Sequence, residues 1–233
     1  MKRALLAGAA IALGGCGFNM EPTGPEKHET ESVDLDKSEL VRTEIKMGAG
    51  ELQINGGASR LLDADFTYNI PSWKPSVKYT SSGVRGNLLI EQPGKSHNLA
   101  SNVRYRWNLQ LNDKVPMDVN ADLGAGEARM NLGSLDLRSV TINMGVGEVR
   151  LDLRGKPSRD YNVEVNGGVG QASILLPRDV GIVATASGGI GNISVRGLEK
   201  RGAQWINPAH ENAAVTIHLD VKGGVGEINL IAE

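Results

Sequence analysis

The residues that could carry chemistry in this chain form six short glycine-rich phrases. Each phrase reads Gly-x-Gly followed by a polar residue, and glycine makes up 30 of the 233 residues. Glycine-rich turns can cradle a phosphate with their backbone amides, and carboxylates beside such bends can bind calcium. The polar residues that follow the six bends are Glu51, Glu127, Glu148, Gln171, Asn192 and Glu227.

The surroundings of the phrases argue against both chemistries. A dinucleotide-binding loop needs a third glycine and a following helix, whereas here the third glycine is missing and a strand-like pattern follows. Calcium-binding nonapeptides place an aspartate two positions after the last glycine, and that position is apolar in all six phrases. Two interpretations of the four glutamates remain: a weak cation site along one edge, or solvated corner residues that keep the edge soluble.

The other reactive side chains form no catalytic set. The four histidines, at positions 28, 97, 210 and 218, lack metal-ligand spacing, and no nucleophile-elbow phrase is present. An enzyme acting on envelope polymers would need paired carboxylates. No such spacing relates the acidic residues near the aromatic-rich stretch, which are Asp63, Asp65, Glu91 and Asp113. We therefore predict a non-enzyme with no catalytic residues, no metal site and no cofactor.

Aromatic side chains gather in one stretch, where six of the nine Phe, Trp and Tyr residues lie between positions 66 and 107. Exposed tyrosine and tryptophan can stack on sugars or anchor a partner. The candidate binding residues are Trp73, Tyr79, Tyr105 and Trp107. The alternative is that these rings fill the core of a capping sub-sheet. Whether the rings are exposed or buried distinguishes the binding interpretation from the core-filling one.

The elements that position these residues are short strands. The first glycines of the phrases lie at 48, 124, 145, 168, 189 and 224, so the steps are 76, 21, 23, 21 and 35 residues. Alternating apolar and polar residues flank each phrase, which predicts strands with one buried face. We expect positive φ at the bends, and we expect the small residue between the two glycines to point inward.

Such units must stack to bury their apolar faces. The predicted fold class is therefore all-β: a stacked β-solenoid or sandwich-like repeat domain with Gly-x-Gly bends.

Further segments point to a family. Residues 107–113 (WNLQLND) precede 116–119 (PMDV), and 132–137 (LGSLDL) follow the second phrase. Together with the Gly-Ala-Gly-Glu phrases, they make residues 40–233 resemble the bacterial toast-rack domain, which is related to the C-terminal domain of LiaF-like envelope-stress regulators. The resemblance implies an all-β domain without established enzymatic activity, found in many members that are attached to the envelope.

The N-terminal residues indicate export. A basic start and about ten apolar residues precede Cys16, the only cysteine, as in a secretory signal peptide with a lipobox. We predict a lipoprotein signal peptide over 1–16, lipidation of Cys16, a flexible tether over 17–39 and the repeat domain over 40–233. The tether prediction rests on prolines, many charges and few apolar residues.

The sequence therefore predicts a non-catalytic, membrane-anchored cell-envelope lipoprotein that acts as an interaction or scaffold module. The alternative is a glycan or cell-wall binding module that uses the aromatic-rich insertion 66–107. The expected partners are the membrane, through the lipid anchor, and an envelope protein or glycan. The formal net charge of −2 and the lack of a basic run argue against nucleic acid.

Overall fold

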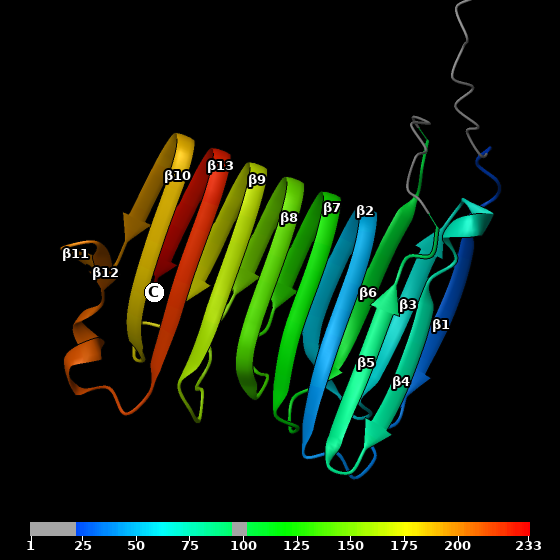
Figure 1. Ribbon diagram of the computed structural model, residues 1–233, viewed down its shortest axis with the longest axis horizontal. Coiled ribbons are helices and arrows are strands. Elements are labelled where there is room, and N and C mark those ends of the chain that lie inside the picture. Colours follow the sequence, from blue (N-terminus) through cyan, green and yellow to red (C-terminus); the bar gives the residue numbers. More distant parts are fainter. Residues whose placement is uncertain (1–21, 95–101) are drawn as a thin grey trace, which may run out of the picture.

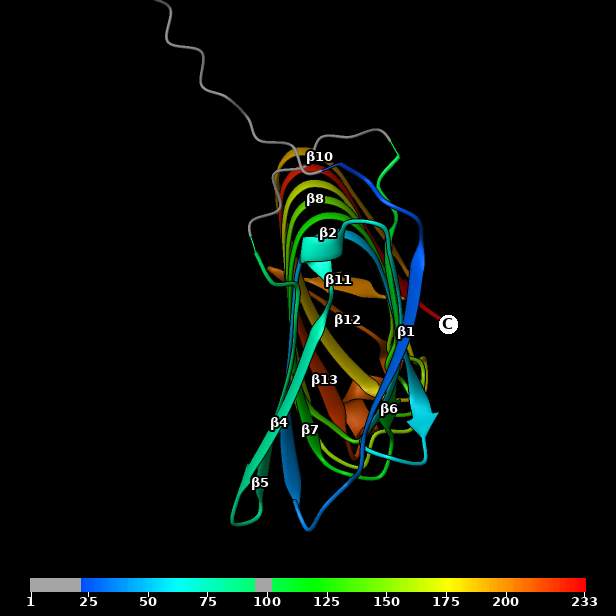
Figure 2. The same cartoon turned by 90° about the vertical axis from the view of Figure 1, so that its right-hand side faces the viewer.

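The protein is a stack of strands that bend in the middle, so that each forms an arch with two legs (Figures 1 and 2). The computed structural model describes residues 22–94 and 102–233. Every arch carries one glycine phrase at its bend. In chain order the arches are β2 (Leu40–Ala58), β7 (Met117–Asn131), β8 (Leu137–Asp152), β9 (Tyr161–Leu176), β10 (Gly181–Arg196) and β13 (Thr216–Ala232).

The arches pair in parallel with the glycine phrases aligned. Gly147 of β8 lies opposite Gly126 on one side and Gly170 on the other, and the same rung continues through the whole stack. Inward-facing apolar residues alternate with outward polar ones along each leg, and the inward residues fill the arches. The all-β repeat prediction is confirmed.

The order of the arches departs from chain order at one end. The spatial order is β2-β7-β8-β9-β13-β10, so the C-terminal strand lies between β9 and β10. The 35-residue step is the detour that this insertion requires, and it contains β11 (Glu199–Arg201), β12 (Gln204–Ile206) and the short helix η2 (Pro208–Asn212). Strand β12 pairs with β10 only at Val183 and Ala184.

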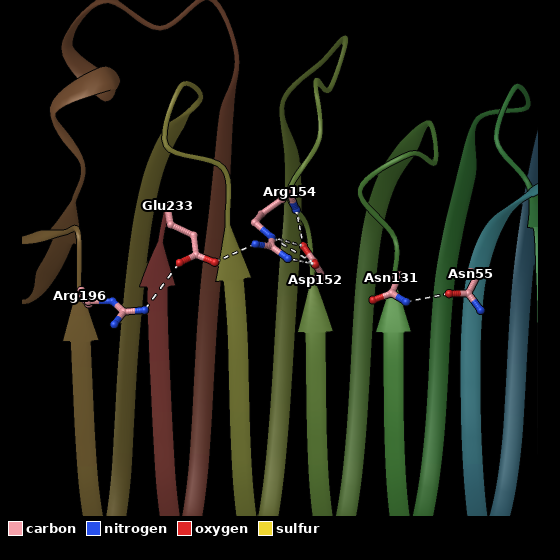
Figure 3. A network of polar contacts seen from close by, with 6 residues as sticks. All are labelled: Asn55, Asn131, Asp152, Arg154, Arg196 and Glu233. Carbon is pink, nitrogen blue, oxygen red and sulfur yellow. Dashed lines mark hydrogen bonds and ion pairs between the residues drawn. The ribbon is translucent and has the colours of Figure 1, made fainter.

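Polar contacts tie the leg ends together at the edge opposite the bends (Figure 3). Arg154, which follows β8, pairs with Asp152 at 2.6 Å and with the C-terminal Glu233 at 2.7 Å. The other carboxylate oxygen of Glu233 lies 3.6 Å from Arg196 of β10. The side chain of Glu233 therefore links the end of β8 to the end of β10, although such exposed pairs contribute little stability.

A cap covers the β2 end of the stack, opposite the β10 end. Strand β5 (Arg85–Glu91) pairs with the first leg of β2, and β6 (Tyr105–Asn112) pairs with its second leg. The cap is completed by β4 (Ser76–Ser82) beside β5, β3 (Leu62–Tyr68) beside β6, β1 (Lys27–Val33) beside β3, and the short helix η1 (Pro71–Trp73).

Strand β1 corrects the tether prediction, because it lies inside the range 17–39. The strand pairs with β3 along its whole length, from Lys27 opposite Tyr68 to Val33 opposite Leu62. Its side chains are mostly exposed, so it has no apolar alternation to reveal it. Backbone hydrogen bonds to β3 hold it in place, and the folded domain starts before residue 40.

The bends themselves give one confirmation and one correction. The second glycine has positive φ as expected, for example +141° at Gly147. The residue between the glycines, however, does not point inward. Its side chain lies on the convex side of the bend, and this corrects the expectation for Ala49, Ala125, Val146, Val169, Ile190 and Val225.

Candidate functional site

The outward residues at the bends form a continuous apolar row, which we call the bend ridge. It consists of Val146 (54% exposed), Val169 (49%), Val225 (45%) and Ile190 (73%), on the neighbouring arches β8, β9, β13 and β10. Neighbouring strands lie about 4.8 Å apart, so the side chains line up. The same rung carries only alanine on β2 and β7, at Ala49 and Ala125, so the ridge is confined to one half of the stack.

The concentration of exposed apolar side chains in one row is unusual. Among the described residues, five large hydrophobic side chains are exposed, and four of them are the ridge. The fifth, Val84, lies in the turn between β4 and β5. Single exposed apolar residues are normal on a protein surface, whereas adjacent ones mark contact sites.

The polar residues after the bends flank the ridge on one rung, as the repeat predicts. The rung runs through Glu51, Glu127, Glu148, Gln171, Glu227 and Asn192 in stack order. Two of its carboxylates already have cationic partners: Glu51 pairs with Arg106 at 2.8 Å, and Glu127 pairs with Arg129. The hydrogen bond from Arg106 lowers the pKa of Glu51.

This rung does not bring oxygen ligands to one point. Gln171 and Asn192 interrupt it, and within 22–94 and 102–233 no three His, Cys, Asp or Glu side chains gather in a group that could hold a metal ion. The arrangement is that of a solvated polar rim beside the ridge.

The aromatic candidates lie in the cap and are mostly buried. Trp73, Tyr105 and Trp107 are at most 5% exposed, and Tyr105 makes edge-to-face contacts with both tryptophans at centroid distances of 5.2 and 5.6 Å. The hydroxyl of Tyr105 donates to the carbonyl oxygen of Trp73 at 2.8 Å, and burial raises the pKa of that hydroxyl. These three rings have no free face on which a sugar could stack.

The fourth aromatic candidate is half-buried and already engaged. The hydroxyl of Tyr79 donates to Asp36 at 2.7 Å and lies 2.9 Å from the hydroxyl of Ser38. The glycan hypothesis, which needed a platform of exposed rings at Trp73, Tyr79, Tyr105 and Trp107, is therefore corrected: the rings fill the core of the cap. Cys16, the predicted lipidation site, lies outside the described residues.

The bend ridge is the feature that sequence reasoning missed. Its signal was present in the sequence, because the residue between the glycines changes from alanine in the first two phrases to valine or isoleucine in the last four. The direction of these side chains could not be read from that pattern. Among the described residues, no helix is long and apolar enough to cross a membrane.

The fold and the bend edge together define a stacked all-β repeat protein, and comparison with known proteins gives its family. Residues 22–175 match the N-terminal domain of toast-rack, DUF2154. The chain belongs to this toast-rack family. No curated protein matches the chain.

One solved structure shares the fold over most of this chain. A crystal structure from Clostridium sporogenes, described as a "putative cell adhesion protein", is 32% identical and superimposes with a TM-score of 0.87 over 90% of this chain and 100% of that one. A "putative adhesin" from Bacteroides fragilis is 12% identical, with a TM-score of 0.32, over 89% of this chain and 98% of that one. The second likeness is too distant to support an argument.

Proposed function

We propose that this protein is a non-catalytic interaction module, held at the cell envelope by a lipid on Cys16, that binds an envelope protein through the bend ridge. The observation that carries the proposal is the row of four exposed aliphatic side chains on adjacent arches. An apolar centre with a polar border is the usual anatomy of a protein contact surface. The 32% identical relative described as a "putative cell adhesion protein" supports an interaction role.

The chemistry of the edge favours a protein partner over a glycan. The ridge is aliphatic, and sugar rings are usually held by flat aromatic faces and hydrogen bonds. The rim beside the ridge carries Glu148 on β8 and Glu227 on β13, so a complementary partner has an apolar strip with basic residues beside it. The glycines on both sides of each ridge residue add no side chains and leave the ridge accessible.

The ridge can be tested without damaging the core. We expect a variant with serine at Val146, Val169, Val225 and Ile190 to keep the fold, because exposed substitutions change stability by only about 0.5 kcal/mol each. Chemical crosslinking in cells, followed by recovery of this chain, should give a discrete partner adduct that the variant loses. Val84→Ser is the matched control, since Val84 is 50% exposed but lies away from the bends. An adduct that survives in the four-site variant would overturn the ridge assignment.

The anchor is tested separately. Only the cysteine thiol can take the lipid, so we expect Cys16→Ser to move the protein from the membrane fraction to the soluble fraction. A single acyl chain anchors only marginally, whereas two or more anchor stably, so the shift should be nearly complete. Persistence of Cys16→Ser in salt-washed membranes would contradict lipid anchoring.

A further inference from the structure

A second feature of the stack lies on the concave side of the bends. A cavity of about 90 Å³ runs inside the arches β8, β9, β13 and β10, directly below the bend ridge, and Val169, Val225 and Ile190 of the ridge are among the residues that line it. Its inner end is Met144 of β8, and its other end reaches Ile193 of β10. The inward-facing side chains that line it are aliphatic, and the backbone groups around it belong to the strand ladder.

The cavity exists because a filling side chain is missing from three successive arches. The inward residue just before the bend is Met47, Leu123 or Met144 in β2, β7 and β8, and each of these is at most 6% exposed. On the same rung β9, β13 and β10 carry Gly167, Gly223 and Gly188.

The backbone does not require these three glycines. None of them has positive φ. A Cβ on Gly188 would meet nothing within 4 Å, and a Cβ on Gly167 would meet only the Lys222 carbonyl oxygen at 3.8 Å. At Gly223, the Cδ1 atom of Ile228 would lie 3.2 Å away and occupies part of the space. Since glycine weakens a strand, the open space is not explained by the needs of the fold.

The cavity is accessible from the β10 end of the stack. Ala172 of β9 is partly exposed, although its counterpart on the same rung of β7, Ala128, is fully buried. Strand β12 covers β10 only at Val183 and Ala184, so within residues 22–94 and 102–233 the outer edge nearer the bend has no strand partner. Edge strands normally carry charges that block pairing, as β1 does, but residues 181–195 of β10 contain none.

We propose that this cavity binds the end of an unbranched alkyl chain, which enters along the stack axis from the β10 end. The proposal does not rest on the proposed function, although three residues of the bend ridge also line the cavity. The side chains missing at Gly167, Gly223 and Gly188 leave a space of about 90 Å³, which is smaller than the roughly 150 Å³ cavity that holds benzene. It therefore suits the last few carbons of a narrow chain better than a ring. A polar guest would lose its hydrogen bonds inside it.

The proposal makes chain length the measured variable. Titration of the full chain with hexanoate, octanoate and decanoate, each below its micelle concentration, should show saturable binding by calorimetry. Affinity should rise about fourfold for each methylene that enters the cavity and should level off when the cavity is full. Affinity that is independent of chain length would overturn the proposal.

Two variants fill the cavity. Gly167→Met and Gly188→Leu restore the type of side chain that the neighbouring arches carry, and we expect unchanged or higher melting temperatures together with loss of decanoate binding. The reciprocal variant Met144→Gly opens the inner wall of the cavity. In this variant the affinity should therefore level off at a longer alkanoate than in the wild-type protein. Decanoate binding to Gly167→Met at wild-type affinity would overturn the assignment to this cavity.

Val146→Ser is the control on the outer side of the neighbouring bend, because Val146 is 54% exposed and is not among the residues that line the cavity, and it should bind decanoate normally. Loss of binding in this variant, with retention in Gly167→Met, would place the alkyl chain on the ridge and refute the proposal. If the wild-type protein binds no decanoate but self-associates, and Gly188→Leu abolishes that self-association, the alkyl-chain proposal is also refuted. The occupant of the β10 end would then be a second copy of this chain. Flotation of Cys16→Ser with phosphatidylcholine vesicles distinguishes the two sources of an alkyl chain. Flotation that the added Gly167→Met substitution removes identifies a lipid acyl chain. No flotation, in a protein that does bind decanoate, identifies a free alkanoate.

Discussion

The bend glycines allow one prediction to be worked out in magnitude. In Gly147→Ala the new Cβ has two separate costs. The backbone there has φ +141°, which costs an L-residue roughly 1–3 kcal/mol. The Cβ would also overlap the carbonyl oxygen of Gly126 on the adjacent arch, and forced overpacking costs about 1–3 kcal/mol. We therefore expect a loss of about 4 kcal/mol in the free energy of unfolding, or roughly 8–16 °C in melting temperature for a domain of this size.

Two control glycines separate these costs. Gly57 has φ +95° but open space around it, so Gly57→Ala should cost only about 1–2 kcal/mol. Gly188 has neither constraint, so Gly188→Ala should be neutral or stabilise by up to about 1 kcal/mol. Urea unfolding followed by circular dichroism measures all three variants. Equal midpoints for Gly147→Ala and Gly188→Ala would refute the conclusion that the bend glycines are required by backbone geometry and close strand approach.

Three further predictions concern the polar groups. Glu148→Gln and Glu227→Gln should each change the unfolding free energy by less than about 0.5 kcal/mol, with or without calcium. If calcium stabilises the wild-type protein and Glu148→Gln removes that stabilisation, the cation-site hypothesis would be restored. Burial and the hydrogen bond to Glu29 raise the pKa of Tyr68 from 10.0 to about 12, so its stabilising effect is full below pH 10 and disappears as the pH rises through 12. Unfolding measured across this range should show a shallower decline in Tyr68→Phe, and identical slopes would contradict this account. Asn207 is 2% exposed, and its side chain accepts a hydrogen bond from the Ile182 amide at 2.8 Å and donates one to the Val180 carbonyl at 2.7 Å. Asn207→Ala should therefore lower the free energy of unfolding by about 2–4 kcal/mol and speed hydrogen exchange in β10. β10 amides that stay protected in this variant would argue against this role.

The repeat architecture could be predicted because its signals are local. Each phrase carries its own bend glycines and its own flanking alternation, so strands, bends and parallel stacking follow from residues such as 140–153 read alone. The order of the arches could not be predicted in this way. The six phrases are nearly equivalent partners, and none of them marks β13 for its place between β9 and β10.

The direction of the side chains at the bends and in the cap could not be predicted from the sequence. Strict alternation from the buried Met144 would place Val146 inside, but the alternation does not continue through the bend, and Val146 is 54% exposed. A tryptophan such as Trp107 has the same type whether it stacks on a ligand or fills a cap, and only the packing of β3 and β6 around it decides. Strand β1 was missed for a related reason, since a strand exposed on both faces has no period-two pattern to detect.

The central functional claim is that the bend ridge contacts an envelope protein, and site-specific photocrosslinking in living cells tests it most directly. A photoreactive residue at Val169 lies in the middle of the ridge, whereas one at Lys156 lies in the exposed β8–β9 loop at the opposite edge of the stack. We predict a discrete adduct from position 169, lost when Val146, Val225 and Ile190 are changed to serine, and none from position 156. Equal adducts from the two positions, or none from position 169, would contradict the account.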